Sequence, residues 1–258
     1  MENRIILTAE QIVSITGGRL LCGDPSAKIR NITTSSLEIK GSDLFIPIVG
    51  ERTDGHKYLV HALEDGAAAS LSEREDILHE KPVIRVENSI AALQKIGAYV
   101  RKNLLTMPFI GVTGSVGKTT TREMIAAALG AQKKVYTTKK NLNSQVGVPV
   151  TVFETETDAD IAVLELGMSR FHEMEEISAV ACPDMAVITN IGICHLANLK
   201  TQENILREKL KILTGLKEGG LLLLNGDDPY LDTIDGNGAE FLLSPNFNLP
   251  LINLISAL

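Results

Sequence analysis

The sequence predicts an α/β protein in which a small N-terminal α/β domain precedes a partial phosphate-loop (P-loop) domain with a mostly parallel sheet. The first observation is that short apolar runs alternate with segments of helical periodicity from residue 107 onward. The second is a glycine-rich stretch, GVTGSVGKTTT at 111–121, between an apolar run and an amphipathic pattern. Such alternation is typical of parallel strands with helices on both faces of the sheet.

The N-terminal domain is expected at residues 1–85, where strand-like runs are mixed with turns. These runs lie at 30–34, 43–48, 67–71 and 82–86. Residues 89–104 then place apolar side chains at helical spacing before Pro108. We therefore expect a helix within a linker at 86–106 that joins the two domains.

The central domain is expected at 107–258. The pattern predicts strands at 109–113, 135–138, 161–166, 185–190 and 220–224, and helices at 119–130, 172–181 and 201–213. The last stretch, 244–258, follows no clear alternation and ends on an apolar run. Because ligands of such sheets bind at the carboxyl ends of the strands, we expect the functional residues there.

Composition limits the kinds of partner and the compartment. The chain has 258 residues, of which 44% are hydrophobic, so it can form a packed core. A net charge of -7 without a long basic run argues against nucleic acid as a partner. Three cysteines without C-x-x-C spacing favour neither disulfides nor a zinc site. With no signal peptide or membrane span in the sequence, we expect a cytoplasmic protein. We also expect a monomer.

The segment 111–121 is interpreted as a loop that binds the phosphates of a nucleotide triphosphate. Gly114 and Gly117 allow positive φ and close approach of anionic oxygens, and the following helix directs its amide groups at them. Lys118 would neutralise the β- and γ-phosphates, and the hydroxyl of Thr119 would ligate Mg²⁺. The other loop positions expected to contact the nucleotide are Ser115, Val116 and Thr120. The alternative is a glycine-rich turn without a catalytic role.

Polar residues at other strand ends fall at the same expected edge of the sheet. Glu165 ends an apolar run, Asn190 ends the next one, and His195 follows shortly after. Each residue also has a structural alternative. Glu165 could be a solvated turn group, Asn190 could cap a strand end, and His195 could be a structural histidine that binds no ligand. The pair Asp227–Asp228 is interpreted as the start of a turn before Pro229 rather than as a metal site.

Several motifs in order resemble those of the Mur ligase family. The loop departs from the general pattern G-x-x-x-x-G-K-[ST], since Val112 stands at the position of the first glycine, but it fits the T-G-x-x-G-K-T-T form of this family. The motifs that carry the resemblance lie at 41–45, 54–56, 111–121, 141–149, 165–168, 190–196 and 225–229.

The resemblance implies an ATP-dependent amide ligase of peptidoglycan synthesis, and hence a role in cell wall formation, cell shape and division. In such enzymes a substrate carboxylate attacks the γ-phosphate, and an amine then attacks the acyl phosphate. By motif, Lys118, Lys209 and His195 would be catalytic, and Thr119, Glu165, His195 and Lys209 would hold Mg²⁺. Lys209 aligns with a lysine that many members carry as a carbamate. The nucleotide would also contact Asn141, Asn143 and Asn190.

Within the family, the motifs favour members that join D-alanyl-D-alanine to UDP-N-acetylmuramoyl-tripeptide. The resemblance implies that Ser36, Asp54 and His56 bind the UDP-sugar, although Ser35-Ser36-Leu37 stands where the family commonly has D-S-R. A ligase for another amino acid therefore stays open as an alternative.

Family members continue through the rest of the central domain and a third, C-terminal domain. We therefore expect the central domain to be incomplete and this polypeptide alone not to be a competent ligase. A nonenzymatic nucleotide-binding remnant is the other alternative.

Overall fold

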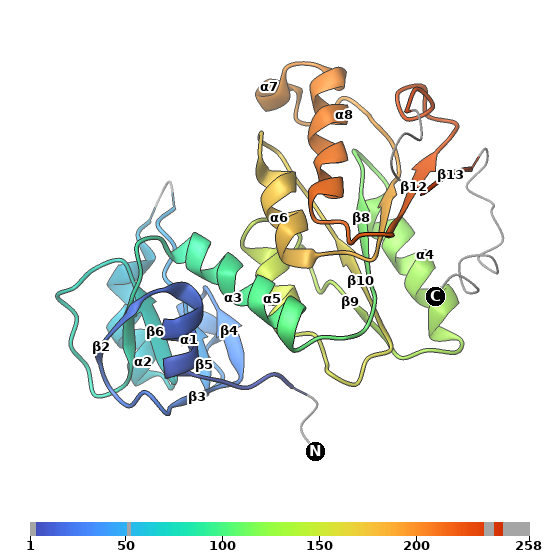
Figure 1. Ribbon diagram of the computed structural model, residues 1–258. Coiled ribbons are helices and arrows are strands. Elements are labelled where there is room, and N and C mark those ends of the chain that lie inside the picture. Colours follow the sequence, from blue (N-terminus) through green and yellow to red (C-terminus); the bar gives the residue numbers. More distant parts are fainter. Residues whose placement is uncertain (1–3, 51–52, 235–239, 245–258) are drawn as a thin grey trace. The chain divides into compact units, whose positions relative to one another are not determined.

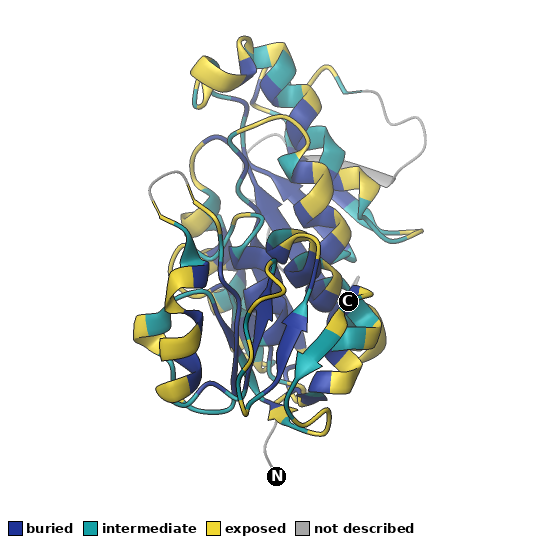
Figure 2. Ribbon diagram, turned by 90° about the vertical axis from the view of Figure 1, so that its left-hand side faces the viewer, coloured by how far each residue is buried: buried dark blue, intermediate teal, exposed yellow. Residues whose placement is uncertain are grey.

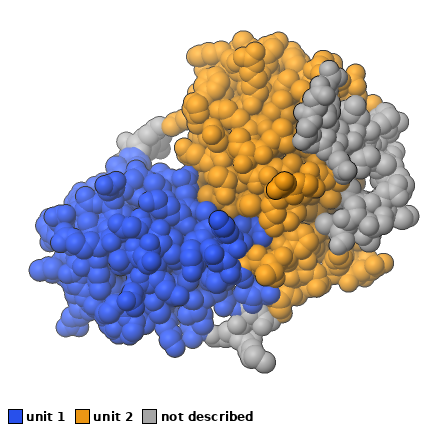
Figure 3. Space-filling model, in the orientation of Figure 1, with its two compact units in different colours: residues 1–104, 152–157 blue, residues 105–151, 158–258 orange. Residues whose placement is uncertain are grey.

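The two larger of three sheets organise the chain, which we describe from a computed structural model that covers residues 4–50, 53–234 and 240–244; the third is a short two-stranded sheet near the N-terminus. The sheets belong to two compact units: unit 1 comprises residues 1–104 and 152–157, and unit 2 comprises 105–151 and 158–258 (Figure 3). Most strands of the two larger sheets whose burial is described are buried, whereas the outward faces of the helices are exposed (Figure 2). The predicted α/β class is confirmed.

Unit 1 is built on a mixed sheet with the order β2-β7-β6-β5-β4, in which only β2 is antiparallel to its neighbour among the described pairs. All four strand-like runs form strands, namely β4 (Asn31–Thr33), β5 (Asp43–Phe45), β6 (Ala69–Ser72) and β7 (Val83–Arg85). The other elements are β1 (Leu7–Thr8), α1 (Ala9–Thr16), β2 (Arg19–Cys22), β3 (Lys28–Ile29), η1 (Ser36–Glu38), η2 (Gly55–Tyr58), α2 (Leu59–Glu64) and α3 (Ser89–Asn103).

Helix α1 shows a start signal that the hydrophobic pattern did not reveal. The Thr8 hydroxyl accepts a hydrogen bond from the Gln11 amide, and the Gln11 side chain accepts one from the Thr8 amide. The helix ends at Gly17, whose φ of 71° suits glycine. The helix expected at 89–104 forms as α3, which begins at an Asn88 cap and groups with unit 1. The Thr8-x-x-Gln11 spacing was therefore an available sequence signal for α1.

Unit 2 has a sheet of parallel strands with the order β13-β12-β11-β8-β10-β9 among the described residues (Figure 1). From β8 the chain moves to one side of the sheet and then crosses to the other, so β8 lies where the direction changes. The bounds are β8 (Phe109–Thr113), α4 (Lys118–Gly130), β9 (Val135–Thr137), α5 (Gly147–Phe153), β10 (Ile161–Glu165), α6 (Glu173–Ala181), β11 (Met185–Ile188), α7 (Leu196–Leu199), α8 (Gln202–Leu210), η3 (Lys211–Thr214), β12 (Leu221–Asn225) and β13 (Glu240–Ser244).

Strand β8 has apolar neighbours on both of its faces. Ile110 and Val112 pack in one cluster with Ile125 and Leu129 of α4. On the other face, a side chain at Gly111 would meet the Leu166 and Ile212 side chains. This two-sided burial explains why β8 and β10 appear in the sequence as continuous apolar runs. It also fixes the carboxyl ends of both strands beside the glycine-rich loop.

The structure adds α5, α7 and β13 to the predicted elements of this domain and divides 201–213 into α8 and η3. Helix α5 contains Pro149, a residue that destabilises helix interiors, but the proline lies in the first turn, where its missing N–H has no partner to lose. Of the stretch 244–258, all but Ser244 lies outside the described residues. No helix within the described ranges is both long and apolar enough to span a bilayer.

Candidate functional site

The glycine-rich loop connects β8 to α4 with a backbone that requires glycine at two positions. Gly114 has a φ of 152° and Gly117 a φ of 80°. A Cβ atom at Gly114 would lie 1.9 Å from the Thr189 Oγ1 atom, which excludes any side chain there without movement of Thr189. The sequence-based expectation of positive φ at both glycines is confirmed.

Residues from the end of β11 hold this loop in shape. The Asn190 Oδ1 atom accepts a hydrogen bond from the Val116 amide at 3.0 Å, and its Nδ2 donates to the Val116 carbonyl at 3.2 Å. The Asn190 carbonyl accepts from the Ser115 amide, and the Thr189 hydroxyl donates to the Val116 carbonyl. In this conformation the Asn190 amide therefore fixes the loop backbone and is engaged with it rather than directed at a ligand.

Lys118 and Thr119 begin α4 beside the loop. The Lys118 Nζ donates to the Gly114 carbonyl at 2.9 Å, so its charge lies over the loop where phosphates would bind. The Thr119 hydroxyl donates to the Glu165 Oε2 at 2.7 Å. Thr120 is exposed on the same first turn. The structure thus brings the predicted residues Thr119 and Glu165 into direct contact.

Glu165 is a buried carboxylate, 5% exposed, at the carboxyl end of β10. Its Oε1 accepts from the Asn143 Nδ2 at 2.8 Å, and its backbone amide donates to the Thr138 hydroxyl at 3.0 Å. Asn143 in turn accepts a bond from the Gly167 amide through its carbonyl. Asn141 lies exposed in the same loop, and its carbonyl accepts from the Asn143 amide. The carboxylate therefore joins three segments of unit 2.

Arg122 is a member of this cluster that the sequence reasoning missed. Its Nη1 lies 3.6 Å from the Glu165 Oε2, and its side chain is only 6% exposed. It follows Lys118 by four residues and Thr119 by three, so all three share one face of α4. That spacing is the sequence signal that could have identified it.

Lys209 and His195 bring further basic groups to the cluster. The Lys209 side chain is buried, and among the described residues its ammonium makes no hydrogen bond or ion pair. Burial, with the nearby Lys118 charge, lowers the pKa of Lys209 to about 8. His195 is exposed, with a φ of 62°, and its pKa is lowered by partial desolvation and then by the Lys209 and Lys118 charges. Both lowered pKa values favour the uncharged forms of the His195 imidazole and the Lys209 amine.

The donor set of this cluster fits a magnesium ion that is shared with a phosphate ligand. Within the described part of the chain, no three His, Cys, Asp or Glu side chains form a group that could hold a metal alone. The Thr119 hydroxyl and the Glu165 carboxylate are hard oxygen donors in direct contact. Because Mg²⁺ usually keeps several waters and needs only one or two carboxylates besides phosphate oxygens, this pair suffices.

Asp228 has the structural role that the sequence suggested for the Asp227–Asp228 pair. Its Oδ1 accepts from the Tyr230 and Leu231 amides, as in a turn, and its Oδ2 accepts from the Ile191 amide at 2.8 Å. The carboxylate thereby ties the turn after β12 to the segment after β11. This use of its oxygens accounts for its burial without a metal.

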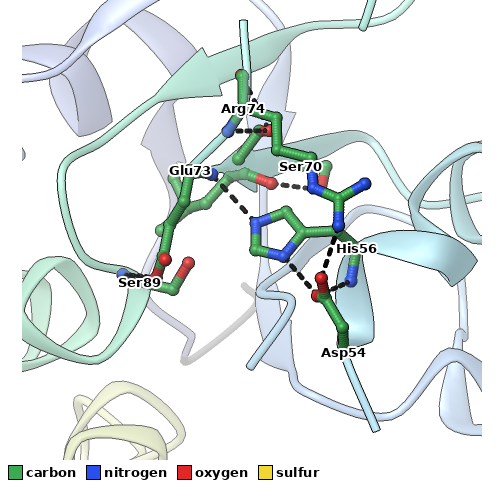
Figure 4. A network of polar contacts seen from close by, with 8 residues as sticks. Asp54, His56, Ser70, Glu73, Arg74 and Ser89 are labelled. Atoms are coloured by element: carbon green, nitrogen blue, oxygen red, sulfur yellow. Dashed lines mark hydrogen bonds and ion pairs between the residues drawn. The ribbon is translucent and has the colours of Figure 1, made fainter. Parts of the chain in front are cut away.

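The predicted substrate residues of unit 1 lie in two places. Asp54 and His56 belong to one polar network (Figure 4). The His56 ring is 1% exposed; its Nδ1 lies 2.7 Å from the Asp54 Oδ1, and its Nε2 accepts from the Glu73 amide at 2.9 Å. Ser36 begins η1, and no bond among the described residues links it to this network. Both ring nitrogens of His56 are thus used within the protein.

The same network keeps Asp54 ionised and reaches α3. Hydrogen bonds from the His56 amide and ring, with Arg74 adding a weaker attraction, lower the pKa of Asp54 to about 2. Glu73 accepts a bond from the Ser89 amide at the first turn of α3 through its side chain. Asp54 also pairs with Arg74. The network therefore connects the segment before η2, the segment after β6 and the start of α3.

Comparisons with known proteins match both units. Residues 28–108 match the description "Mur ligase family, catalytic domain", and residues 112–242 match "Mur ligase middle domain". The UDP-N-acetylmuramoyl-tripeptide--D-alanyl-D-alanine ligase of Bacillus subtilis is 44% identical over 206 residues, which are 79% of this chain and 45% of that protein. The Escherichia coli protein of the same name is 31% identical over 94% of this chain and 53% of its own length.

Solved structures agree with these matches. MurF from Acinetobacter baumannii matches with a TM-score of 0.87 and 29% sequence identity. The match covers 93% of this chain and 54% of the MurF chain. The MurF ligase from Thermotoga maritima in complex with ADP matches with a TM-score of 0.76 and 32% sequence identity. That match covers 83% of this chain and 50% of the Thermotoga chain. This chain spans about half the length of the curated relatives it matches.

Replacement of His56 by alanine should destabilise unit 1 by on the order of 2–4 kcal/mol, because it leaves a cavity and removes two buried hydrogen bonds. Urea unfolding monitored by a probe in unit 1 measures the loss. His61→Ala is the matched control: this ring is 69% exposed and pairs only with Asp65 among the described residues, so little change is expected. Equal effects of the two substitutions would contradict a structural role of His56.

Replacement of Lys209 by methionine should stabilise unit 2 at pH 7 by on the order of 1–3 kcal/mol, because methionine fills a similar volume without a buried amine. The folded-state pKa of about 8 lies below the ordinary 10.5, so the cost of burying the ammonium is complete below pH 8 and is relieved as pH rises towards 10.5. The advantage of the variant should shrink over that window.

Urea unfolding in bicarbonate-free buffer tests this expectation. Lys211→Met is the matched control, because Lys211 pairs with Glu208 at 3.0 Å and its loss should not stabilise the fold. A Lys209→Met protein that is no more stable than the wild type at pH 7 would count against a costly buried amine.

Proposed function

This chain belongs to the Mur ligase family, and we propose that it forms the nucleotide-binding and carboxylate-activating part of a ligase that joins D-alanyl-D-alanine to UDP-N-acetylmuramoyl-tripeptide. The observation that carries the proposal is the contact between Thr119 and Glu165 beside a glycine-rich loop with Lys118 over it. Hydroxyl, carboxylate and ammonium thus meet where two strands and a helix converge. This arrangement suits a nucleotide phosphate with a bound cation better than it suits a structural turn.

The proposed reaction needs activation of a carboxylate, because a carboxylate is a poor electrophile at neutral pH. A substrate carboxylate oxygen attacks the γ-phosphorus of ATP, the bond to the β-phosphate oxygen breaks, and ADP leaves. The amine of D-alanyl-D-alanine then attacks the acyl phosphate, an amide forms, and phosphate and a proton leave. The protein mainly positions the reactants and stabilises charge on the phosphates.

Individual residues have separate tasks in this proposal. Lys118 holds the β- and γ-phosphates, and the loop shaped by Gly114 and Gly117 supplies amide donors. Thr119 and Glu165 hold Mg²⁺, which offsets phosphate charge when it is bound. His195, neutral at pH 7 because its pKa is lowered, supplies a nitrogen for a second metal. Asn141 and Asn143 are proposed to contact the same nucleotide, Asn143 from its place against Glu165, while Asn190 acts through the loop that it shapes.

Lys209 is proposed to act as a carbamate. Its buried amine has a pKa of about 8, well below the ordinary 10.5, so a far larger neutral fraction is available at neutral pH than for an exposed lysine. The neutral amine attacks CO₂, forms an N–C bond and releases a proton, which converts a cation beside Lys118 into an anion. That product removes the repulsion with Lys118 and offers oxygen atoms to a cation.

Unit 1 is proposed to bind the UDP-sugar, with Ser36 as a candidate contact. In this proposal Asp54 and His56 act by shaping the segments around η2 and β6, since the His56 nitrogens are engaged inside the protein. We further propose that the protein works as a monomer in the cytoplasm, where ATP and UDP-linked precursors are present.

Nucleotide binding provides the most direct test of the loop. Lys118→Met should weaken binding of ATP in the presence of Mg²⁺ at least about tenfold, because a charge-assisted contact to the phosphates is lost. Calorimetric titration measures the affinity. Lys133→Met, which follows the far end of α4, should bind ATP like the wild type. Equal ATP affinity in all three proteins would mean that the loop does not bind the phosphates.

A ligase assay with the 258-residue chain tests the reaction. ATP, Mg²⁺, UDP-N-acetylmuramoyl-tripeptide and D-alanyl-D-alanine are supplied, and ADP and the amide product are measured. Product that disappears when D-alanyl-D-alanine is withheld supports the proposed reaction and contradicts the expectation that this polypeptide alone is not a competent ligase. Product with another amino acid in its place indicates a different ligase, and ATP binding without product indicates a nucleotide-binding role for this polypeptide.

The carbamate has a spectroscopic test that does not depend on turnover. After incubation with ¹³C-bicarbonate, the wild type should show a carbamate carbonyl signal by NMR that Lys209→Met lacks. Where the chain has ligase activity, that activity should fall in CO₂-depleted buffer and recover when bicarbonate is added. A signal that persists in Lys209→Met would assign the carbamate elsewhere, and absence of any signal would reject it.

A further inference from the structure

Arg122 is a buried charge for which the proposed reaction gives no reason. Its side chain is 6% exposed and projects from α4 towards the end of β10. A guanidinium carries a positive charge and five N–H donors, so its burial has to be compensated by groups within the protein. Its Nε and Nη1 atoms are buried and have no hydrogen-bond partner among the described residues. Such a group costs stability unless a nearby anion compensates.

Two carboxylates lie beside this guanidinium, and they differ in burial. The Arg122 Nη2 donates to the Glu123 Oε1, but the Glu123 side chain is 59% exposed and therefore well solvated. The Arg122 Nη1 lies 3.6 Å from the Glu165 Oε2, and the Glu165 side chain is 6% exposed. The attraction to Glu165 is therefore screened less by water than the attraction to Glu123.

Glu165 has a matching need for a positive charge. Thr119 and Asn143 donate hydrogen bonds to its two oxygens, but both donors are neutral. Among the described residues, Arg122 is the single cation within ion-pair distance of this carboxylate. Removal of one partner from a buried pair leaves an uncompensated charge, which is the costly outcome.

The pair is also looser than a typical arginine–carboxylate contact. A bidentate pair would place two N–H groups on the two oxygens, whereas here one nitrogen approaches one oxygen at 3.6 Å without a hydrogen bond. Lone pairs on the carboxylate therefore remain for another cation. Arg122 neutralises Glu165 and still leaves it accessible.

We propose that Arg122 is a positioning residue that balances the charge of Glu165 when no divalent cation is present and lowers the affinity of that carboxylate for the cation. The guanidinium lies beside the same carboxylate oxygen that accepts the hydrogen bond from Thr119. A divalent cation that binds Glu165 must then share the carboxylate with a positive charge already beside it, which weakens binding. The metal part of this inference rests on the proposed function, and the charge balance does not.

A double-mutant cycle tests the charge balance. Arg122→Met, Glu165→Gln and the double variant are unfolded in urea with a chelator present. Arg122→Met should lower the unfolding midpoint, because a buried carboxylate loses its counter-charge. The double variant should lose less than the sum of the two single losses, since neither charge remains. Additive losses would overturn the proposal.

Binding of Mn²⁺ alone, measured by electron paramagnetic resonance, tests the effect on the cation. Arg122→Met should bind Mn²⁺ about tenfold more tightly than the wild type, because the repulsion is removed. Glu123→Gln is the matched control: it removes the other partner of Arg122 and leaves the guanidinium beside Glu165, so Mn²⁺ binding should not tighten. Unchanged or weaker binding by Arg122→Met, or no binding by either protein, would overturn the proposal.

The outcomes separate this inference from the proposed function. If the chain fails to bind ATP, but the cycle shows coupling and Arg122→Met binds Mn²⁺ more tightly, the proposed function is rejected and the role of Arg122 is supported. If the chain binds ATP through Lys118, but the losses in the cycle are additive, the proposed function is supported and the role of Arg122 is rejected.

Discussion

The carboxylate of Glu165 is the group on which the site of unit 2 depends. It is buried at the end of β10 and accepts hydrogen bonds from Thr119 of α4 and from Asn143 of the loop after β9. A buried carboxylate must be satisfied on both oxygens, so its partners are fixed as firmly as it is. The parallel pairing of β10 with β8 places this carboxylate next to the glycine-rich loop. The register of the sheet therefore determines the geometry of the site.

Several basic groups gather near this carboxylate. Arg122 lies against Glu165, Lys118 is next to Thr119, and Lys118 is close enough to Lys209 to lower its pKa. The lowered pKa of Lys209 is a direct consequence, because burial and the neighbouring ammonium both disfavour its charged form. A site of this kind gains stability when an anion enters. Phosphate groups or a carbamate would supply that negative charge, which connects the electrostatics of the folded chain to the proposed chemistry.

Unit 1 shows how a motif can have a structural use. Asp54 and His56 belong to a motif shared with the family, and from that resemblance they were expected to contact a substrate. In the structure the His56 ring is buried and bonded through both nitrogens, to Asp54 and to the Glu73 amide (Figure 4). A histidine that satisfies two buried partners fixes the segments on either side of it. The presence of His56 in the motif can therefore be explained by a requirement of the fold as well as by a contact with substrate.

The sequence by itself determined the class of fold, most strands and the loop that requires glycine. Those features follow from local causes: apolar runs specify buried strands, and Gly114 and Gly117 specify positive φ. It also placed Thr119 and Glu165 at one edge of the sheet, because strand ends of a parallel sheet share an edge. Only the tertiary structure decided which polar groups meet there. Arg122 against Glu165, Asn190 against the loop backbone and the buried amine of Lys209 result from contacts between segments distant in sequence, and no local pattern encodes a distance between two helices or strands.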